Sequence, residues 1–217
     1  MKLVLFDFDG TLIDSAELIH ETMRRTFRHY GKAEPTLDDT KSIIGLTLDI
    51  AISRLDGKPH VDDEAGEMMA YYKSLFSTVR TDLDFREPLF PGIREVLDEL
   101  FGRPDMLVGG VTGKSRRGLN FALDTHGFGP HFVVSRTADD CPSKPHPAMV
   151  NECCDATGIA PADTLVIGDA IYDMQMAKAA GATAIGVSWG YASVAGLLAA
   201  GADHIIDHPR ELLSHLG

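Results

Sequence analysis

The fold is decided near the start of the chain, where residues 3–11 read Leu-Val-Leu-Phe-Asp-Phe-Asp-Gly-Thr. The first four residues form an apolar run without polar alternation, which is typical of a strand buried on both faces of a parallel sheet. Asp7 and Asp9 follow this run directly, and Gly10 permits an unusual backbone conformation after them. The stretch therefore predicts a buried strand that carries two carboxylates to one edge of a sheet.

Further apolar runs repeat this pattern in the second half of the chain. The clearest candidate strands are Met106 to Val111, Thr164 to Ile167 and Thr183 to Val187, with weaker candidates at Phe132 to Val134 and Ile205 to Ile206. Helical stripes of apolar residues separate these runs, so strand and helix alternate through this half of the chain. The alternation predicts an α/β fold with a doubly wound parallel sheet.

The stretch between the first strand and this second half breaks the alternation. It contains no convincing strand, and apolar residues recur at helical spacing from Ala16 to Tyr30 and from Val61 to Val79. A helical block inserted here is expected to cover the carboxyl end of the first strand, where ligands bind in open α/β sheets. We therefore predict a catalytic core of residues 1–14 and 87–217 and an all-α helical cap of residues 15–86.

The composition excludes several classes of protein. The chain has 217 residues, and 32 acidic against 20 basic residues give it a formal net charge of −12. Nucleic acid and anionic lipid both require a basic face, so neither is expected as a partner. Three cysteines suggest no disulfide framework, and no apolar run approaches the roughly 18 residues of a membrane span. We expect a soluble cytoplasmic protein, and the sequence carries no prediction of its oligomeric state.

Three further signals lie at the ends of predicted strands or in adjoining loops. Thr112 and Gly113 close the run that begins at residue 106, and Lys144 lies between Ser143 and a proline. Asp169 and Asp173 are four residues apart, so both carboxylates can point the same way if their segment is helical. We expect these side chains to gather in one crevice with the two carboxylates of the first strand.

These four motifs, in this order, resemble those of phosphohydrolases of the haloacid dehalogenase superfamily that carry a helical cap after the first motif. Segments 112–118, 143–149 and 189–191 are similar to the phosphoglycolate-phosphatase-like branch of that superfamily. The resemblance implies a Mg²⁺-dependent phosphatase that hydrolyses a small organic phosphomonoester, such as phosphoglycolate. It also implies an aspartyl-phosphate intermediate, and a small phosphorylated metabolite as the partner.

The same residue types suit phosphoryl transfer, which needs an in-line nucleophile and positive charge around the transferred oxygens. Asp7 is predicted to be the nucleophile, and Asp9 to protonate the leaving oxygen and later activate water. Thr112 would donate a hydrogen bond to the phosphoryl group, and Lys144 would supply a fixed positive charge.

A metal site is predicted among the acids, because carboxylates crowded into one crevice repel each other unless a cation lies between them. Their hard oxygen atoms suit Mg²⁺. The resemblance implies that Asp7 binds the metal through its side chain and Asp9 through its backbone carbonyl. Asp169 is the third predicted ligand, and Asp173 is predicted to orient a metal-bound water or Lys144.

Weaker candidates for substrate binding come from the loops around these motifs; they are Gly10, Gly113, Lys114, Arg117, Gly45 and Thr47. Backbone N–H groups near Phe8, Asp9 and Gly113 are expected to help bind the phosphoryl oxygens. Lys114 and Arg117 either attract a substrate carboxylate or belong to a solvated helix start. The loop that contains Gly45 and Thr47 either meets the substrate or is an ordinary interhelical turn.

Alternative functions fit parts of the pattern. A phosphomutase of the same superfamily keeps the second acid and the same type of cap, so the motifs do not separate it from a phosphatase. A dehalogenase does not need Asp9. A receiver-type domain that only accepts a phosphoryl group lacks a helical insertion and places its acid on a later strand. A nucleotide-binding P-loop at residues 109–115 fails in its glycine spacing by one residue.

Overall fold

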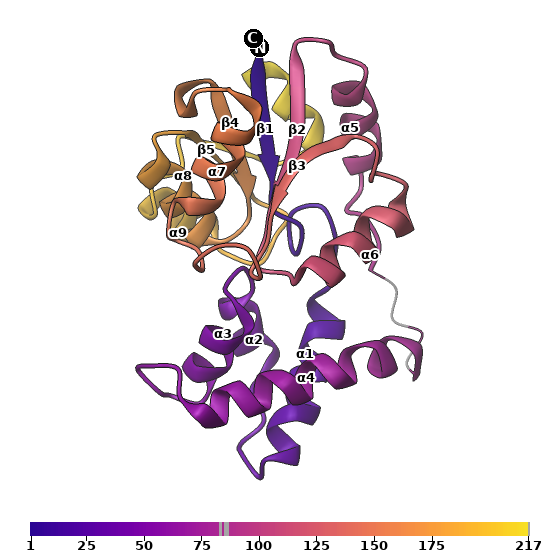
Figure 1. The fold of residues 1–217 in the computed structure, drawn as a ribbon, viewed down its shortest axis with the longest axis vertical. Helices are drawn as coiled ribbons and strands as arrows, with labels where there is room; N and C mark the ends of the chain where they lie inside the picture. The colour runs from indigo at the N-terminus through magenta and orange to yellow at the C-terminus, as the bar shows by residue number, and fades with distance from the viewer. Residues whose placement is uncertain (83, 85–86, 217) are drawn as a thin grey trace.

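The computed structural model describes residues 1–82, 84 and 87–216, and it contains a parallel sheet with helices on both faces (Figure 1). The strands run in the order β3-β2-β1-β4-β5-β6 across the sheet. Their bounds are Lys2–Phe6 for β1, Met106–Val111 for β2, Phe132–Arg136 for β3, Thr164–Gly168 for β4, Thr183–Val187 for β5 and His204–Ile206 for β6. The predicted doubly wound α/β fold is confirmed, and each predicted apolar run forms a strand.

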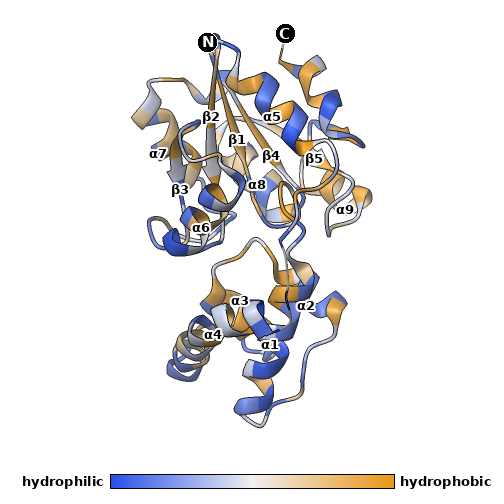
Figure 2. Cartoon of the chain, turned by 90° about the vertical axis from the view of Figure 1, so that its right-hand side faces the viewer, coloured by the Kyte–Doolittle hydropathy of each residue, from blue (hydrophilic) through white to orange (hydrophobic). Residues whose placement is uncertain are grey.

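Alternate residues of β1 face two separate hydrophobic layers, which is why its sequence shows no polar alternation. Val4 and Phe6 pack on the side covered by α5 (Ile93–Phe101) and α6 (Arg116–His126). Leu3 and Leu5 pack on the side covered by α7 (Ala148–Thr157), α8 (Ile171–Ala180) and α9 (Val194–Ala199). Figure 2 shows the central strands as a hydrophobic layer between these helices. The sheet is therefore rigid where it meets the predicted site.

The order of the strands reverses on either side of β1 and β4, which places a topological switch point between these two strands. Phe6 pairs with Gly110 of β2 on one side and with Ile167 of β4 on the other. The carboxyl ends of the three strands therefore lie level at one edge of the sheet. Ligands of open α/β sheets bind at this kind of position.

Helices α1 (Ala16–His29), α2 (Leu37–Ile43), α3 (Leu48–Leu55) and α4 (Asp63–Asp82) form the all-α cap beyond that edge (Figure 1). Met23, Phe27 and Met68 belong to its hydrophobic cluster, which also takes in Ala170 and Tyr172 of the sheet domain. The cap thus rests on the loop after β4 and on the start of α8. The predicted cap boundary at residue 86 lies outside the described residues, so the division at residues 14/15 and 86/87 stays a prediction.

The two segments that join the cap to the sheet run side by side. Ile13 forms an antiparallel bridge with Leu89, and the Asp14 backbone N–H donates to the Pro88 carbonyl over 2.9 Å. Any movement of the cap must therefore bend both segments together.

Among the described residues, no helix combines the length and the apolar composition that crossing a membrane requires.

Candidate active site

Side chains from five separate segments meet at the carboxyl edge of the sheet. Asp7 follows β1, Thr112 follows β2, Asp169 follows β4, Asp173 lies in the first turn of α8, and Lys144 lies in the loop before α7. All five are buried, with at most 1% of each residue exposed. The structure thus joins Asp7, Lys144, Asp169 and Asp173 in one cluster and places Thr112 at the same edge of the sheet, whereas the Asp9 side chain has a different set of partners.

Lys144 is the positive charge within this cluster. Its Nζ atom lies 2.9 Å from Asp7 Oδ1 and 2.6 Å from Asp173 Oδ1. The carboxylate oxygens of Asp7, Asp169 and Asp173 lie within 4.8 Å of one another. The cluster therefore holds three buried carboxylates and one buried ammonium, which contacts two of them, so negative charge is in excess when all three are ionised.

The protonation of the cluster reflects this excess. Burial raises the pKa of Asp7 to about 7, although the neighbouring Lys144 opposes the rise. Burial also raises the pKa of Asp169 well above its usual range, and the charges of Asp7 and Asp173 add to the effect. Carboxylates with raised pKa values in one crevice are typical of a functional site.

The cluster fits a hard divalent cation such as Mg²⁺. Its candidate ligand atoms are carboxylate oxygens, which this ion prefers. Asp7 Oδ2 is buried without a hydrogen-bond partner, and Asp7 Oδ1 has the ion pair with Lys144 but not the angles of a hydrogen bond. A buried carboxylate that lacks hydrogen bonds is costly unless a cation approaches it. Which residues hold the ion stays a prediction, including the predicted backbone carbonyl of Asp9.

Asp173 has both of its carboxylate oxygens engaged. Oδ1 accepts from Lys144 Nζ over 2.6 Å, and Oδ2 accepts from the Ala170 backbone N–H over 3.0 Å. This geometry favours the predicted role of Asp173 in orienting Lys144.

Asp169 is oriented by contacts from two loops. Thr11 Oγ1 donates to Asp169 Oδ1, and the Tyr191 backbone N–H donates to Oδ2, each over 2.9 Å. A Cβ atom at Gly10, where φ is +86°, would lie 2.2 Å from Asp169 Oδ2, and one at Gly190 would lie 2.1 Å from Asp169 Cβ. Both glycines are therefore needed to leave room for this side chain, a role that the sequence did not indicate for Gly190.

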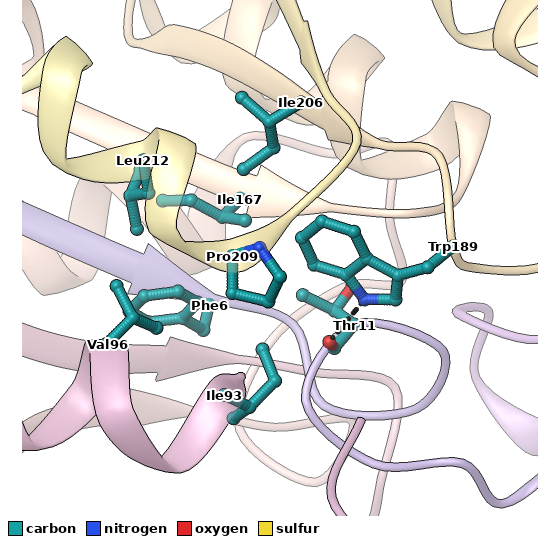
Figure 3. A pocket seen from close by; sticks show the side chains of 9 residues that line it. All are labelled: Phe6, Thr11, Ile93, Val96, Ile167, Trp189, Ile206, Pro209 and Leu212. Atoms are coloured by element: carbon teal, nitrogen blue, oxygen red, sulfur yellow. Dashed lines mark hydrogen bonds between the residues drawn. The ribbon is translucent and has the colours of Figure 1, made fainter. Parts of the chain in front are cut away.

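The loop after β5 also contacts the loop after β1, through Trp189 and Thr11. Its indole Nε1–H donates to the Thr11 carbonyl over 3.0 Å, beside a small apolar pocket that Phe6, Ile167 and Pro209 help to line (Figure 3). The ring packs against the core on one face of the sheet. The role of Trp189 is thus to support Thr11, which in turn orients Asp169.

Asp9 has contacts of its own with Ser15, where the chain enters the cap, and with Lys114. Its Oδ1 atom accepts a hydrogen bond from Ser15 Oγ and lies 2.7 Å from Lys114 Nζ. Lys114 Nζ also lies 3.3 Å from Glu87 Oε1. The ammonium of Lys114 is therefore paired with two carboxylates of the chain, and its predicted contact with the substrate stays a prediction. Arg117 is exposed on α6, and its predicted contact with the substrate stays a prediction.

The loop between α2 and α3 lies directly on the site. The Thr47 backbone N–H donates to Ser143 Oγ over 2.9 Å. A Cβ atom at Gly113 would lie only 2.6 Å from the Leu46 carbonyl oxygen and 2.8 Å from that of Gly45. These contacts favour the interpretation of this loop as one that meets the substrate, and they show the cap closed on the sheet domain.

We expect Gly113→Ala to prevent full closure of the cap. Gly113 does not have a left-handed backbone, so alanine adds no strain at residue 113 itself, and the clash of its methyl group falls on the backbone of the cap loop. The new methyl group would push the loop away from the site, and we expect kcat/KM for phosphate release to fall by about 10- to 100-fold. Gly102→Ala, where the nearest atom would be 3.5 Å away, is the control. Unchanged kcat/KM in the Gly113 variant would contradict the prediction.

Comparison with known proteins agrees with this geometry. The family model described as haloacid dehalogenase-like hydrolase matches residues 4–187, so the chain belongs to that family of hydrolases. Membership excludes the receiver-type domain and the nucleotide-binding P-loop.

Curated relatives align along most of the chain. Pyrophosphatase PpaX of Bacillus velezensis is 30% identical over 215 residues, which cover 99% of this chain and 95% of the relative. Phosphoglycolate phosphatase of Nitrosospira multiformis is 31% identical over 197 residues, which cover 88% and 85%. The predicted resemblance to the phosphoglycolate-phosphatase-like branch is thereby confirmed.

Solved structures share the whole fold. The haloacid dehalogenase-like hydrolase from Bacteroides fragilis superposes with a TM-score of 0.84 at 28% identity and covers 97% of this chain and 99% of its own. A structure described as a predicted phosphatase from Clostridium acetobutylicum gives a TM-score of 0.86 at 23% identity over 99% of this chain and 97% of its own, which supports the fold alone.

Proposed function

We propose that the chain is a Mg²⁺-dependent phosphatase that hydrolyses a small organic phosphomonoester through an aspartyl-phosphate. The observation that carries the proposal is Asp7, a buried carboxylate that lies at the switch point of the sheet, pairs with Lys144 and has the Asp169 carboxylate within 4.8 Å. The named activities of the relatives, phosphoglycolate phosphatase and pyrophosphatase, support the same reaction class.

In the first step, a carboxylate oxygen of Asp7 attacks phosphorus while the bond from phosphorus to the leaving oxygen breaks. The leaving oxygen takes the proton of the Asp9 carboxyl group and departs as an alcohol. Thr112 and Lys144 stabilise the negative charge on the transferred oxygens. The Thr112 Oγ1 atom accepts from the Lys114 backbone N–H over 3.2 Å, so its own O–H remains available to donate.

In the second step, the oxygen of a water molecule attacks phosphorus, and the water gives a proton to the Asp9 carboxylate. The bond from phosphorus to the Asp7 oxygen breaks, which releases inorganic phosphate and restores the Asp7 carboxylate. Asp9 is protonated again and ready for the next substrate, so the cycle balances. A group that acts as acid and then as base must lie within hydrogen-bond reach of both oxygens.

Mg²⁺ bound by Asp7 and Asp169 would offset the negative charge of the carboxylates and of the incoming phosphate. The closed cap would exclude bulk water and restrict the substrate to a small leaving group. The three cysteines are free and buried, which supports a reducing compartment such as the cytoplasm.

A panel of phosphorylated compounds tests the function. We expect Mg²⁺-dependent release of inorganic phosphate from at least one of phosphoglycolate, pyrophosphate or a hexose phosphate, and a loss of at least about 100-fold after chelation with EDTA, because Mg²⁺ would stabilise the transferred charge. Readdition of Mg²⁺ should restore the rate. Conversion of a hexose phosphate into an isomer without release of phosphate would favour a phosphomutase instead. Undiminished release in EDTA would contradict the metal dependence.

A further inference from the structure

Both segments that connect the cap to the sheet are linked to the same carboxylate oxygen of Asp9, the first directly and the second through Lys114. Ser15, where the chain enters the cap, donates from Oγ to Asp9 Oδ1. Glu87, where the chain returns, lies 3.3 Å from Lys114 Nζ, and that atom lies 2.7 Å from Asp9 Oδ1. Within the described residues, these contacts involve Oδ1, which leaves Oδ2 as the oxygen that can face a leaving group.

The contacts are shielded from water. The exposed fractions of the side chains are 11% for Asp9, 8% for Lys114 and 8% for Glu87. Arg80 of the cap continues the series, because its Nη2 atom lies 2.6 Å from Glu87 Oε2 and its guanidinium lies over the Phe121 ring of α6. Ion pairs that are shielded in this way hold their geometry far better than exposed pairs do.

Lys114 is also fixed at its backbone. Its N–H donates to Thr112 Oγ1 over 3.2 Å, and its carbonyl accepts from the Ala138 N–H over 3.1 Å. Its side chain is held between Asp9 and Glu87, so it is not free to swing toward a substrate carboxylate. The geometry instead suits a group that supports Asp9.

We propose that Lys114 and Glu87 are positioning residues for the general acid: Glu87 holds Lys114, and Lys114 holds Asp9 Oδ1 so that Oδ2 faces the leaving oxygen. The proposal rests on the proposed function, in which Asp9 protonates that oxygen. A proton donor must be held closely in its productive orientation, and a small displacement lowers its rate steeply.

The consequence is a dependence on the leaving group. An alkyl phosphate, such as phosphoglycolate, leaves as a basic alkoxide unless it is protonated, so it needs the acid. The leaving group of p-nitrophenyl phosphate is a stable phenolate that departs with little help. Misplacement of Asp9 should therefore slow the alkyl substrate far more than the aryl one.

The experiment compares kcat/KM for the two substrates, because this parameter covers only the steps through departure of the leaving group. We expect Lys114→Met and Glu87→Gln each to lower the value for the alkyl phosphate by about 10- to 100-fold, and that for the aryl phosphate by less than about 3-fold. Asp9→Asn should show the same selectivity with a larger loss. The double variant Asp9→Asn/Glu87→Gln should have the same ratio of alkyl to aryl kcat/KM as Asp9→Asn alone.

Lys32→Met is the matched control, because Lys32 also bridges two carboxylates, Asp56 and Glu64, but lies in the cap away from the site. This variant should leave the ratio unchanged. A selective loss in Asp9→Asn shows that the assay detects loss of the acid. If the Lys114 and Glu87 variants then lose kcat/KM equally on both substrates, or lose none, the proposal is overturned. Absence of phosphate release by the unmodified chain from p-nitrophenyl phosphate and from every compound of the panel would instead overturn the proposed function, and this inference with it.

Discussion

Replacement of Asp7 by Asn should abolish phosphate release, with a loss in kcat of roughly 10⁴-fold or more, because removal of a covalent nucleophile costs about this much or more in enzymes that depend on one. The amide has nearly the shape of the carboxylate but cannot form the acyl phosphate. The measurement is release of inorganic phosphate with saturating Mg²⁺ from the best substrate of the panel.

The fold should survive this change. The pKa of Asp7 is raised to about 7, so near neutral pH the folded chain without metal already tolerates an uncharged group at this position. An Asn side chain keeps an oxygen toward Lys144, which lies 2.9 Å from Asp7 Oδ1. We therefore expect a cooperative unfolding transition close to that of the unmodified chain.

Two outcomes decide the nucleophile assignment. Asp105→Asn is the control, because Asp105 pairs with Arg103 on the surface, 3.0 Å away, and should keep full activity. Acid quenching during turnover, followed by mass spectrometry, should find a phosphorylated peptide containing residue 7 in the unmodified chain but not in Asp7→Asn. Phosphate release by Asp7→Asn at a tenth of the normal rate or more would rule out Asp7 as the nucleophile.

The second large effect is expected from Lys144→Met, which removes the ammonium that pairs with two carboxylates of the buried cluster of three. Breaking a buried ion pair in this way typically costs about 3–5 kcal/mol of unfolding free energy. We expect a loss of this size at pH 8 in EDTA, with phosphatase activity lost as well. Urea unfolding at several pH values measures it.

The loss of stability should shrink at lower pH. The folded-state pKa of Asp7 is raised to about 7, so the stability linked to this group is present when it is protonated and is lost as the pH rises through that value. Lys144 lowers the pKa of Asp7, so its removal raises that pKa further. The difference between the two proteins should therefore be smaller at pH 5.5 than at pH 8.

Mg²⁺ provides an independent check on the same variant. A cation bound among the carboxylates would offset part of the missing charge, so Mg²⁺ should restore part of the stability at pH 8. Lys178→Met is the control, because its pair with Asp203 is exposed and should contribute about 0.5 kcal/mol or less at either pH. An equal loss at both pH values would show that Lys144 acts through packing and not through charge.

Most of the fold could be predicted because its signals are local. The run from Leu3 to Phe6 needs only its own composition to indicate a strand buried on both faces, and it proved to be β1 at the centre of the sheet. The helical spacing of apolar residues from Ala16 to Tyr30 is an equally local signal, and this stretch forms α1.

The contacts around Asp9 could not be predicted in this way. Glu87 follows a stretch of cap sequence without any motif of its own, and Ser15 looks like an ordinary start of a helix. Tyr191 belongs to a segment similar to the phosphoglycolate-phosphatase-like branch, yet only the folded chain shows that its hydroxyl accepts from the backbone N–H groups of Ser15 and Ala16, over 3.0 and 3.1 Å. These partners are at least six residues apart in the sequence, and most are much further apart.

The sequence by itself determined that a buried strand ends in two acids and that a helical block follows them. These properties depend on residue type and spacing, which a linear chain displays in full. The tertiary structure alone decided which charges pair: Lys144 with Asp7 and Asp173, and Lys114 with Asp9 and Glu87. Ion pairs depend on distances of a few ångströms between segments that are remote in the chain, and the packing of strands, helices and loops in the sheet domain sets those distances.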